Sequence, residues 1–183
     1  MPRLHHLPRL RPEWYRGEAV VFWTDTVEKR ATGWLNPDFH QRFREVLLHA
    51  SVRYAISCPV YILLPDHWHW IGIGAAPSAD QARASRFLRS RLQPRLSPAR
   101  LQPQAYDHVL RQEERERDAF RSTLDYLLQN PVRASLVSRP QDWPYRGTLV
   151  PGFPDLDPFQ EQAEEEFWKC HRLWQQTHPT AWS

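Results

Sequence analysis

The chain has 183 residues, of which 41% are hydrophobic, and its formal net charge is +3. This length and composition allow a buried core and exclude a disordered acidic chain. No apolar run approaches the roughly 20 residues that a membrane helix needs. Cys58 and Cys170 lack the spacing of a zinc ribbon or a disulfide framework, so a cytoplasmic protein is expected.

Residues 19 to 130 alternate between strand and helix patterns. Runs of β-branched and aromatic residues mark strands, and apolar residues at helical spacing mark helices. In chain order the sequence predicts a strand at 19–24, a helix at 36–54, strands at 54–64 and 67–73, a helix capped by Ser78, a loop at 93–104, a strand at 105–110 and a helix at 113–130. This order predicts an α+β fold of the split βαβ, ferredoxin-like or RRM-like type, with an antiparallel sheet and helices on one face.

The sequence also suggests three segments. Residues 1–17 are expected to be a flexible lead-in, and residues 18–150 the main domain. The chain becomes Pro-rich and irregular from Pro140. Residues 151–183 are expected to form an acidic C-terminal extension with a helix at 159–176.

The first candidate for chemistry is the pair His67 and His69 on a predicted strand. Side chains alternate across a strand, so both imidazoles project from one face and can hold one divalent metal ion if a third ligand comes from elsewhere. The alternative is two surface histidines on an edge strand. The flanking apolar residues favour a buried central strand, in which two histidines need polar partners, and a metal would supply one.

The second candidate is Tyr126 with Asn130, one helical turn apart and therefore on one helix face. The amide oxygen of Asn130 can be the missing metal ligand, with the Tyr126 phenol beside it. A phenol, with a pKa near ~10, is a poor nucleophile at neutral pH unless a cation or base activates it. The alternative is a core tyrosine followed by an Asn-Pro helix stop.

The third candidate is a basic surface. Residues 1–150 carry 22 Arg or Lys against 15 Asp or Glu, and residues 151–183 carry 2 against 6. Nearly all the basic residues are Arg, which binds phosphate through two N–H groups at once, although a codon bias is an alternative cause. A series without intervening acidic residues, expected either to bind phosphates or to form a solvated helix face, consists of Arg83, Arg86, Arg89, Arg91, Arg95 and Arg100.

The combination of motifs resembles a known family. Residues 64–69 (LPDHWH) are similar to the PDHxH form of the HUH motif, in which a bulky apolar residue separates two histidines. Residues 126–134 (YLLQNPVRA) resemble the tyrosine segment of REP-associated tyrosine transposases, which are single-tyrosine HUH transposases of the insertion-sequence type. Residues 106–111 and 142–145 are also typical of that family, and the motifs occur in its order.

The resemblance implies that residues 18–150 are a catalytic domain with Mg²⁺ or Mn²⁺ at His67, His69 and Asn130. It implies a 5′-phosphotyrosine intermediate on Tyr126, single-stranded DNA with a REP-like hairpin as substrate, and a monomer or homodimer without a membrane partner. Arg133, just past the tyrosine helix, is expected near the scissile phosphate.

The sequence departs from the family at two places. The family usually has Gly where this chain has Ser135, a change expected to alter only a helix end. Trp68 is bulkier than the usual residue between the histidines and is expected to narrow the site.

Two rival interpretations remain open on the sequence alone. One is a non-catalytic nucleic-acid-binding protein on the same scaffold. The other is a structural-zinc or metal-oxygenase domain that uses the two histidines with Asp107 or His108 as a further ligand.

Overall fold

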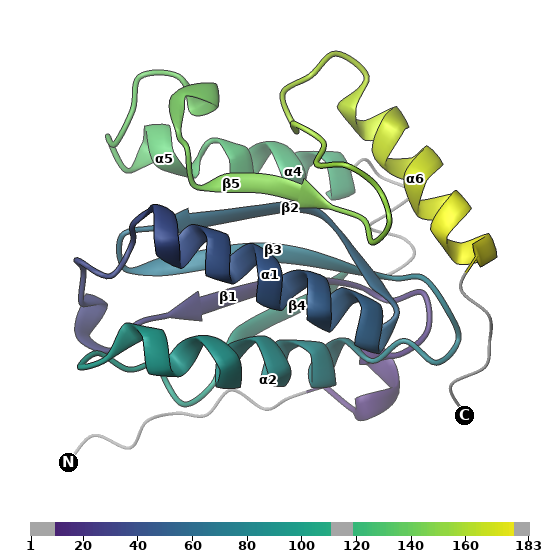
Figure 1. The fold of residues 1–183 in the computed structure, drawn as a ribbon, viewed down its shortest axis with the longest axis horizontal. Coiled ribbons are helices and arrows are strands. Elements are labelled where there is room, and N and C mark those ends of the chain that lie inside the picture. The colour runs from purple at the N-terminus through teal and green to yellow at the C-terminus, as the bar shows by residue number, and fades with distance from the viewer. Residues whose placement is uncertain (1–9, 111–118, 178–183) are drawn as a thin grey trace.

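The computed structural model describes residues 10–110 and 119–177, which are built on a five-stranded antiparallel sheet of strand order β4-β1-β3-β2-β5 (Figure 1). The strands are β1 (Val20–Thr26), β2 (Ile56–Leu64), β3 (His67–Gly74), β4 (Tyr106–Leu110) and β5 (Arg146–Leu149). The helices are α1 (Pro37–Tyr54), α2 (Gln81–Leu92), α4 (Ala119–Leu128), α5 (Asn130–Arg133) and α6 (Ala163–Thr177). Short 3-10 turns are η1 (Pro12–Tyr15), η2 (Glu28–Arg30), η3 (Gln93–Leu96) and η4 (Pro140–Asp142). The predicted α+β fold class is confirmed, and the predicted hairpin β2–β3 lies in the middle of the sheet.

Helix starts follow from capping side chains. The Asn36 side chain accepts a hydrogen bond from the Phe39 N–H at 2.8 Å, which fixes the start of α1 as predicted. The second helix is capped by Asp80 rather than Ser78, because the Asp80 carboxylate accepts the bond from the Arg83 N–H at 2.9 Å.

Helices cover both faces of the sheet. On one face α1 and α2 lie side by side (Figure 1) over a core that contains Trp23, Trp68 and Trp70. Helices were expected on one face only, but α4 and α6 cover the opposite face. The reason is that every residue of β2 is buried, so apolar side chains on both sides of the central hairpin need covering.

The fifth strand was not predicted. The chain around β5 was expected to be irregular, because it is Pro-rich from Pro140 onward. The preceding residues are held to the end of β2: the Trp143 indole N–H donates to the Leu63 carbonyl at 2.8 Å, and the Leu63 N–H donates to the Tyr145 carbonyl at 2.9 Å. Pairing with the open edge of β2 therefore makes this segment a strand.

The predicted third helix is divided in the structure. Its expected start at Glu113 lies outside the described residues, α4 ends at Leu128, and α5 starts at Asn130. Ser135, just after α5, has a φ of 57°. This left-handed conformation favours glycine at helix ends, which explains why the resembled family has Gly there.

The lead-in expected at residues 1–17 is packed from η1 onward. Tyr15 is buried, stacks on Trp23 with ring centroids 5.8 Å apart, and donates its hydroxyl hydrogen to Asp107. None of the helices in the described part of the chain has the length and apolar character needed to cross a membrane.

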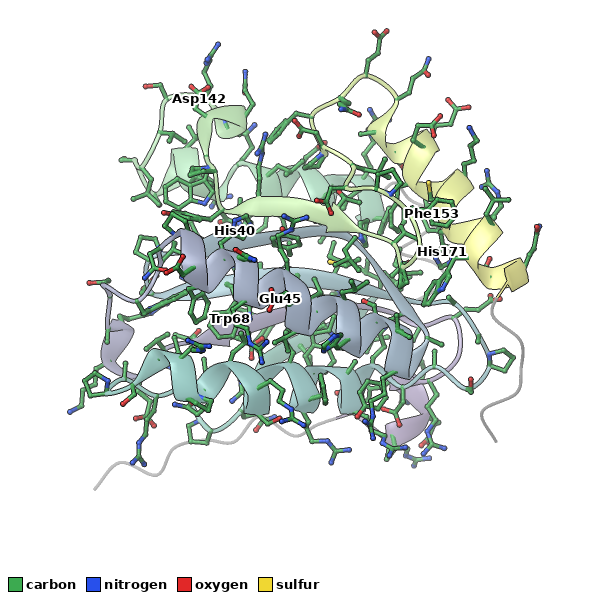
Figure 2. The ribbon with its side chains drawn as sticks, viewed as in Figure 1. His40, Glu45, Trp68, Asp142, Phe153 and His171 are labelled. Atoms are coloured by element: carbon green, nitrogen blue, oxygen red, sulfur yellow. The ribbon has the colours of Figure 1, made fainter. Side chains whose placement is uncertain are left out.

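The last helix is fixed to the sheet by a buried histidine. It begins at Ala163 rather than at the predicted Phe159. On its inner face, His171 places Nδ1 2.7 Å from the Ser57 hydroxyl oxygen and stacks on Phe167 (Figure 2). Burial, and then the charge of Arg172, lower the pKa of His171 to about 4.

The docking of α6 should therefore depend on pH. Because the pKa of His171 is lower in the folded than in the unfolded protein, its contribution is fully present above about pH 6.5 and is lost as the pH falls towards about 4. The free energy of unfolding of the wild type should fall over that range as His171 takes up a proton. In His171→Gln, whose side chain does not titrate, we expect this fall to be smaller by roughly 1–2 kcal/mol. Urea denaturation at both ends of the range measures this, and parallel losses in the two proteins would contradict it.

Candidate functional site

Two imidazole rings meet at the start of β3. Nε2 of His67 lies 3.1 Å from Nε2 of His69, and the rings are nearly perpendicular, at 87°. Both rings project from the α4 side of the sheet. His69 is 7% exposed and stacks on Phe22, whereas His67 is partly exposed. The pair thus sits on the central strand, with one ring accessible to solvent.

The other ring nitrogens are held by neighbouring side chains. Nδ1 of His67 lies 2.6 Å from an Asp66 carboxylate oxygen, and Nδ1 of His69 lies 2.8 Å from the Thr24 hydroxyl oxygen. Arg30 donates to Asp66 at 3.1 Å. A carboxylate only accepts, so Nδ1 of His67 carries the proton, and the Thr24 hydroxyl can accept from His69 in the same way. In this arrangement both Nε2 atoms turn lone pairs towards one another.

Burial and charge favour a neutral His69 and an ionised Asp66. Burial, followed by the charges of His67 and Arg30, lowers the pKa of His69 to about 3. Burial alone would raise the pKa of Asp66, but the hydrogen bond from His67 and the charge of Arg30 hold it below its ordinary value. Two converging lone pairs without a proton between them repel, and a divalent cation relieves that repulsion. The donor set therefore fits a metal ion.

The tyrosine segment lies on the same face of the sheet as the histidines. Leu127 of α4 is buried in one core with Ile62, the β2 neighbour of His69. Tyr126 itself is 46% exposed, and the guanidinium carbon of Arg133 lies 4.6 Å from its ring centroid. The structure thus brings Tyr126 and Arg133 together.

The expected third ligand is oriented by its own helix end. The Asn130 amide nitrogen donates to the Leu127 carbonyl at 3.3 Å. This bond does not involve the amide oxygen, which is the atom that a metal would need. Among the described residues, neither Tyr126 nor Asn130 hydrogen-bonds to His67 or His69, and no group of three or more His, Cys, Asp and Glu is arranged to hold a metal ion.

Trp68 does not narrow the site. It is fully buried on the α1 side of the sheet (Figure 2), where its ring contacts Trp34 and Phe43. Alternation along β3 sends it to the face opposite His67 and His69. The expected narrowing is therefore wrong.

The rival ligand Asp107 is also on the wrong face. It pairs with Trp23 across β1 and β4 and accepts from Tyr15, on the α1 side of the sheet. His108 shares the α4 face and pairs with Phe22 of β1. It lies on β4, which β1 separates from the histidine pair on β3.

The predicted arginine series divides into two roles. Arg83, Arg86, Arg91 and Arg95 are exposed on α2 and η3, on the sheet face opposite the histidines. Arg89 does not belong with them. Its guanidinium forms an ion pair with the fully buried Asp25 and donates to the Gln102 carbonyl, so it is part of the fold rather than a DNA contact.

Several residues of the site were not expected from the sequence. Asp66 lies inside the PDHxH segment and was a visible signal. Thr24 and Arg30 were not, because β1 and η2 bring them to the histidines only in the folded chain. Arg53 also joins the α2 arginines: its guanidinium lies 5.9 Å from the Phe87 ring, and that of Arg91 lies 5.3 Å from it.

The fold is shared with a solved complex of a transposase and DNA. No family model and no curated protein matches the sequence. Among solved structures, the chain is similar to a REP-associated tyrosine transposase bound to a REP hairpin, with a TM-score of 0.64 and 21% identity over 76% of this chain and 82% of that chain. At this identity the likeness establishes the fold alone, and the fold that the resembled family implied is thus confirmed.

Proposed function

We propose that the protein is a metal-dependent single-stranded DNA endonuclease and strand transferase of the REP-associated tyrosine transposase type. The observation that carries the proposal is the pair of histidine Nε2 atoms that face each other at 3.1 Å, with both Nδ1 atoms engaged elsewhere. The shared fold and the order of the sequence motifs support it.

In this proposal His67, His69 and the Asn130 amide oxygen hold Mg²⁺ or Mn²⁺. A bound ion would withdraw charge from the scissile phosphate and so stabilise the transition state. Because the ligands are neutral, they leave nearly the full charge of the ion for that purpose. Thr24 and Asp66 keep the imidazoles in the tautomer that directs Nε2 inward.

Tyr126 is the proposed nucleophile. Its phenolic oxygen forms a bond to phosphorus, the bond from phosphorus to the 3′-oxygen breaks, and the 3′-oxygen takes up a proton while the phenol gives one to solvent. The product is a 5′-phosphotyrosine with a free 3′-hydroxyl. Arg133 places a positive charge over the Tyr126 ring, beside the phosphate oxygens that would approach it. The ester keeps the energy of the broken bond, so a 3′-hydroxyl can later rejoin strands.

The proposed partner is single-stranded DNA with a REP-like hairpin. The solved relative was bound to a REP hairpin. The direct test is incubation of the protein with a hairpin-bearing strand and Mn²⁺, followed by denaturing electrophoresis. A covalent protein–DNA adduct supports the proposal; binding without any adduct would instead favour the non-catalytic nucleic-acid-binding protein.

Thr24 should act as a positioning residue for His69. We expect Thr24→Val, which keeps the shape but removes the hydroxyl, to weaken Mn²⁺ binding roughly 10–100-fold, because the His69 ring loses the partner that fixes its tautomer. Thr24→Ser should restore most of the affinity. Calorimetry measures the binding, and nitrogen NMR of the metal-free protein reports the tautomer. Equal Mn²⁺ affinity in the Val and Ser variants would contradict this role.

The exposed α2 arginines should contribute to the salt dependence of DNA binding. We expect Arg86→Ala with Arg91→Ala to reduce the slope of log affinity against log salt by about 0.7–0.9 for each phosphate that the protein no longer neutralises. A matched control is Arg42→Ala with Arg121→Ala, since these two arginines already pair with acidic residues. If both double variants keep the wild-type slope, the α2 arginines are a solvated face.

A further inference from the structure

A cavity of about 260 Å³ lies between α1, β5 and the acidic segment 155–160. It is distinct from the histidine site: its wall includes Tyr61, which projects from the α1 side of β2. His40 lines it next to β5 (Figure 2). Two arginines, Arg44 from α1 and Arg146 from β5, complete the basic part of the lining.

The Arg146 guanidinium is largely buried and has unused donor capacity. Its side chain is 15% exposed, and its guanidinium carbon lies 4.8 Å from the centre of the Phe159 ring. One nitrogen, Nη2, lies 3.3 and 3.5 Å from the two carboxylate oxygens of Asp157. Nε is buried and has no hydrogen-bond partner among the described residues. The N–H groups on Nε and Nη2 point the same way and can bind two oxygens of one anion, but Asp157 engages only Nη2. The unsatisfied buried donor on Nε needs an explanation.

Arg44 is held in a similar way by Asp155. Both carboxylates belong to one segment without helix or strand, and both are in contact with solvent, with side-chain exposures of 61% for Asp155 and 44% for Asp157. Ion pairs whose carboxylate stays in contact with water contribute little to stability. Another anion can therefore replace the two carboxylates at small cost.

Another part of the lining is polar and formed by His40 and Tyr61. The Tyr61 hydroxyl oxygen lies 3.0 Å from Nε2 of His40. Burial, and then the charge of Arg44, lower the pKa of His40 to about 4, so this pair is neutral at physiological pH. A Cβ at Gly147 would lie 2.5 Å from the Tyr61 hydroxyl oxygen. Glycine at this position thus leaves room for the hydroxyl beside the two arginines.

We propose that Arg44 and Arg146 form a phosphate-binding site, in which the carboxylates of Asp155 and Asp157 stand in for a phosphate group. A tetrahedral phosphate offers oxygens to Nε and Nη2 of Arg146 at once, which the present carboxylate does not. The phosphate is that of a DNA strand, an identification that rests on the proposed function, and the acidic segment competes with the strand for the two arginines.

The test uses the full chain and two anions, inorganic phosphate and a single-stranded oligonucleotide. We expect Asp155→Asn with Asp157→Asn to bind both about tenfold more tightly than the wild type, because the competing carboxylates are gone. The charge-matched control is Glu45→Gln with Glu166→Gln, which also removes two carboxylates from exposed ion pairs but outside the cavity. Adding Arg44→Gln or Arg146→Lys to the Asn variant should abolish the gain, with folding checked by circular dichroism.

Each outcome decides a part of the proposal. An Asn variant that binds phosphate no more tightly than the control variant overturns the site. If the tighter binding persists after Arg44→Gln or Arg146→Lys is added, the assignment to Arg44 and Arg146 is wrong. A gain for phosphate without one for the oligonucleotide supports the anion site and overturns DNA as its source. The phosphate result does not depend on strand cleavage, so it stands even if the protein forms no covalent adduct.

Discussion

Tyr126→Phe should reduce cleavage of a hairpin-bearing DNA strand by more than roughly 1,000-fold and should leave DNA binding unchanged. The substitution removes only the phenolic oxygen. Tyr126 is 46% exposed on α4, so the loss leaves no buried polar partner without a hydrogen bond, and the ring that Arg133 covers is kept. A single-turnover assay with Mn²⁺ measures the cleavage, and a gel-shift assay measures the binding.

Tyr106 provides a matched control for this experiment. It is also exposed, at 51%, and lies on the same face of the sheet, but on the edge strand β4. Tyr106→Phe should cut as the wild type does. If the Tyr126→Phe variant still forms a covalent adduct with DNA, another residue is the nucleophile and the assignment of Tyr126 is wrong.

Loss of either histidine should remove metal binding and cleavage together. We expect His67→Ala and His69→Ala each to weaken Mn²⁺ binding by at least about 100-fold, since a direct ligand matters more than the outer partners, whose loss costs roughly 10–100-fold. Calorimetry with Mn²⁺ and the cleavage assay are the two measurements. His49→Ala is the control, because His49 is exposed on α1, away from the site.

The two histidine variants should differ in stability. His67 is partly exposed, and its replacement should change the free energy of unfolding little. His69 is buried, and its removal leaves the Thr24 hydroxyl without its ring partner, at a cost of about 1–3 kcal/mol. His67→Ala is therefore the cleaner test of the site. Unchanged Mn²⁺ binding in both variants would make the pair ordinary structural histidines.

Elements with strong local signals could be predicted from the residues along the chain. The Asn36 cap, the two apolar runs of the hairpin and their alternation fixed α1, β2 and β3, and alternation alone put His67 and His69 on one face. The spacing of Tyr126 and Asn130 was visible for the same reason, because helical periodicity is a local property. The motif order led to the family whose fold the structure shares.

Features that depend on contacts between distant segments became visible only in the folded chain. β5 is a strand because the edge of β2 is open, not because of its own residues. Arg89 does not lie on the surface with the other arginines of α2, because it forms an ion pair with Asp25, a buried residue of β1. The partner of His69 comes from β1, and the carboxylates that cover Arg44 and Arg146 come from beyond β5. Such pairings leave no periodic pattern in the sequence, because they are selected by the packing of the whole sheet and not by neighbours along the chain.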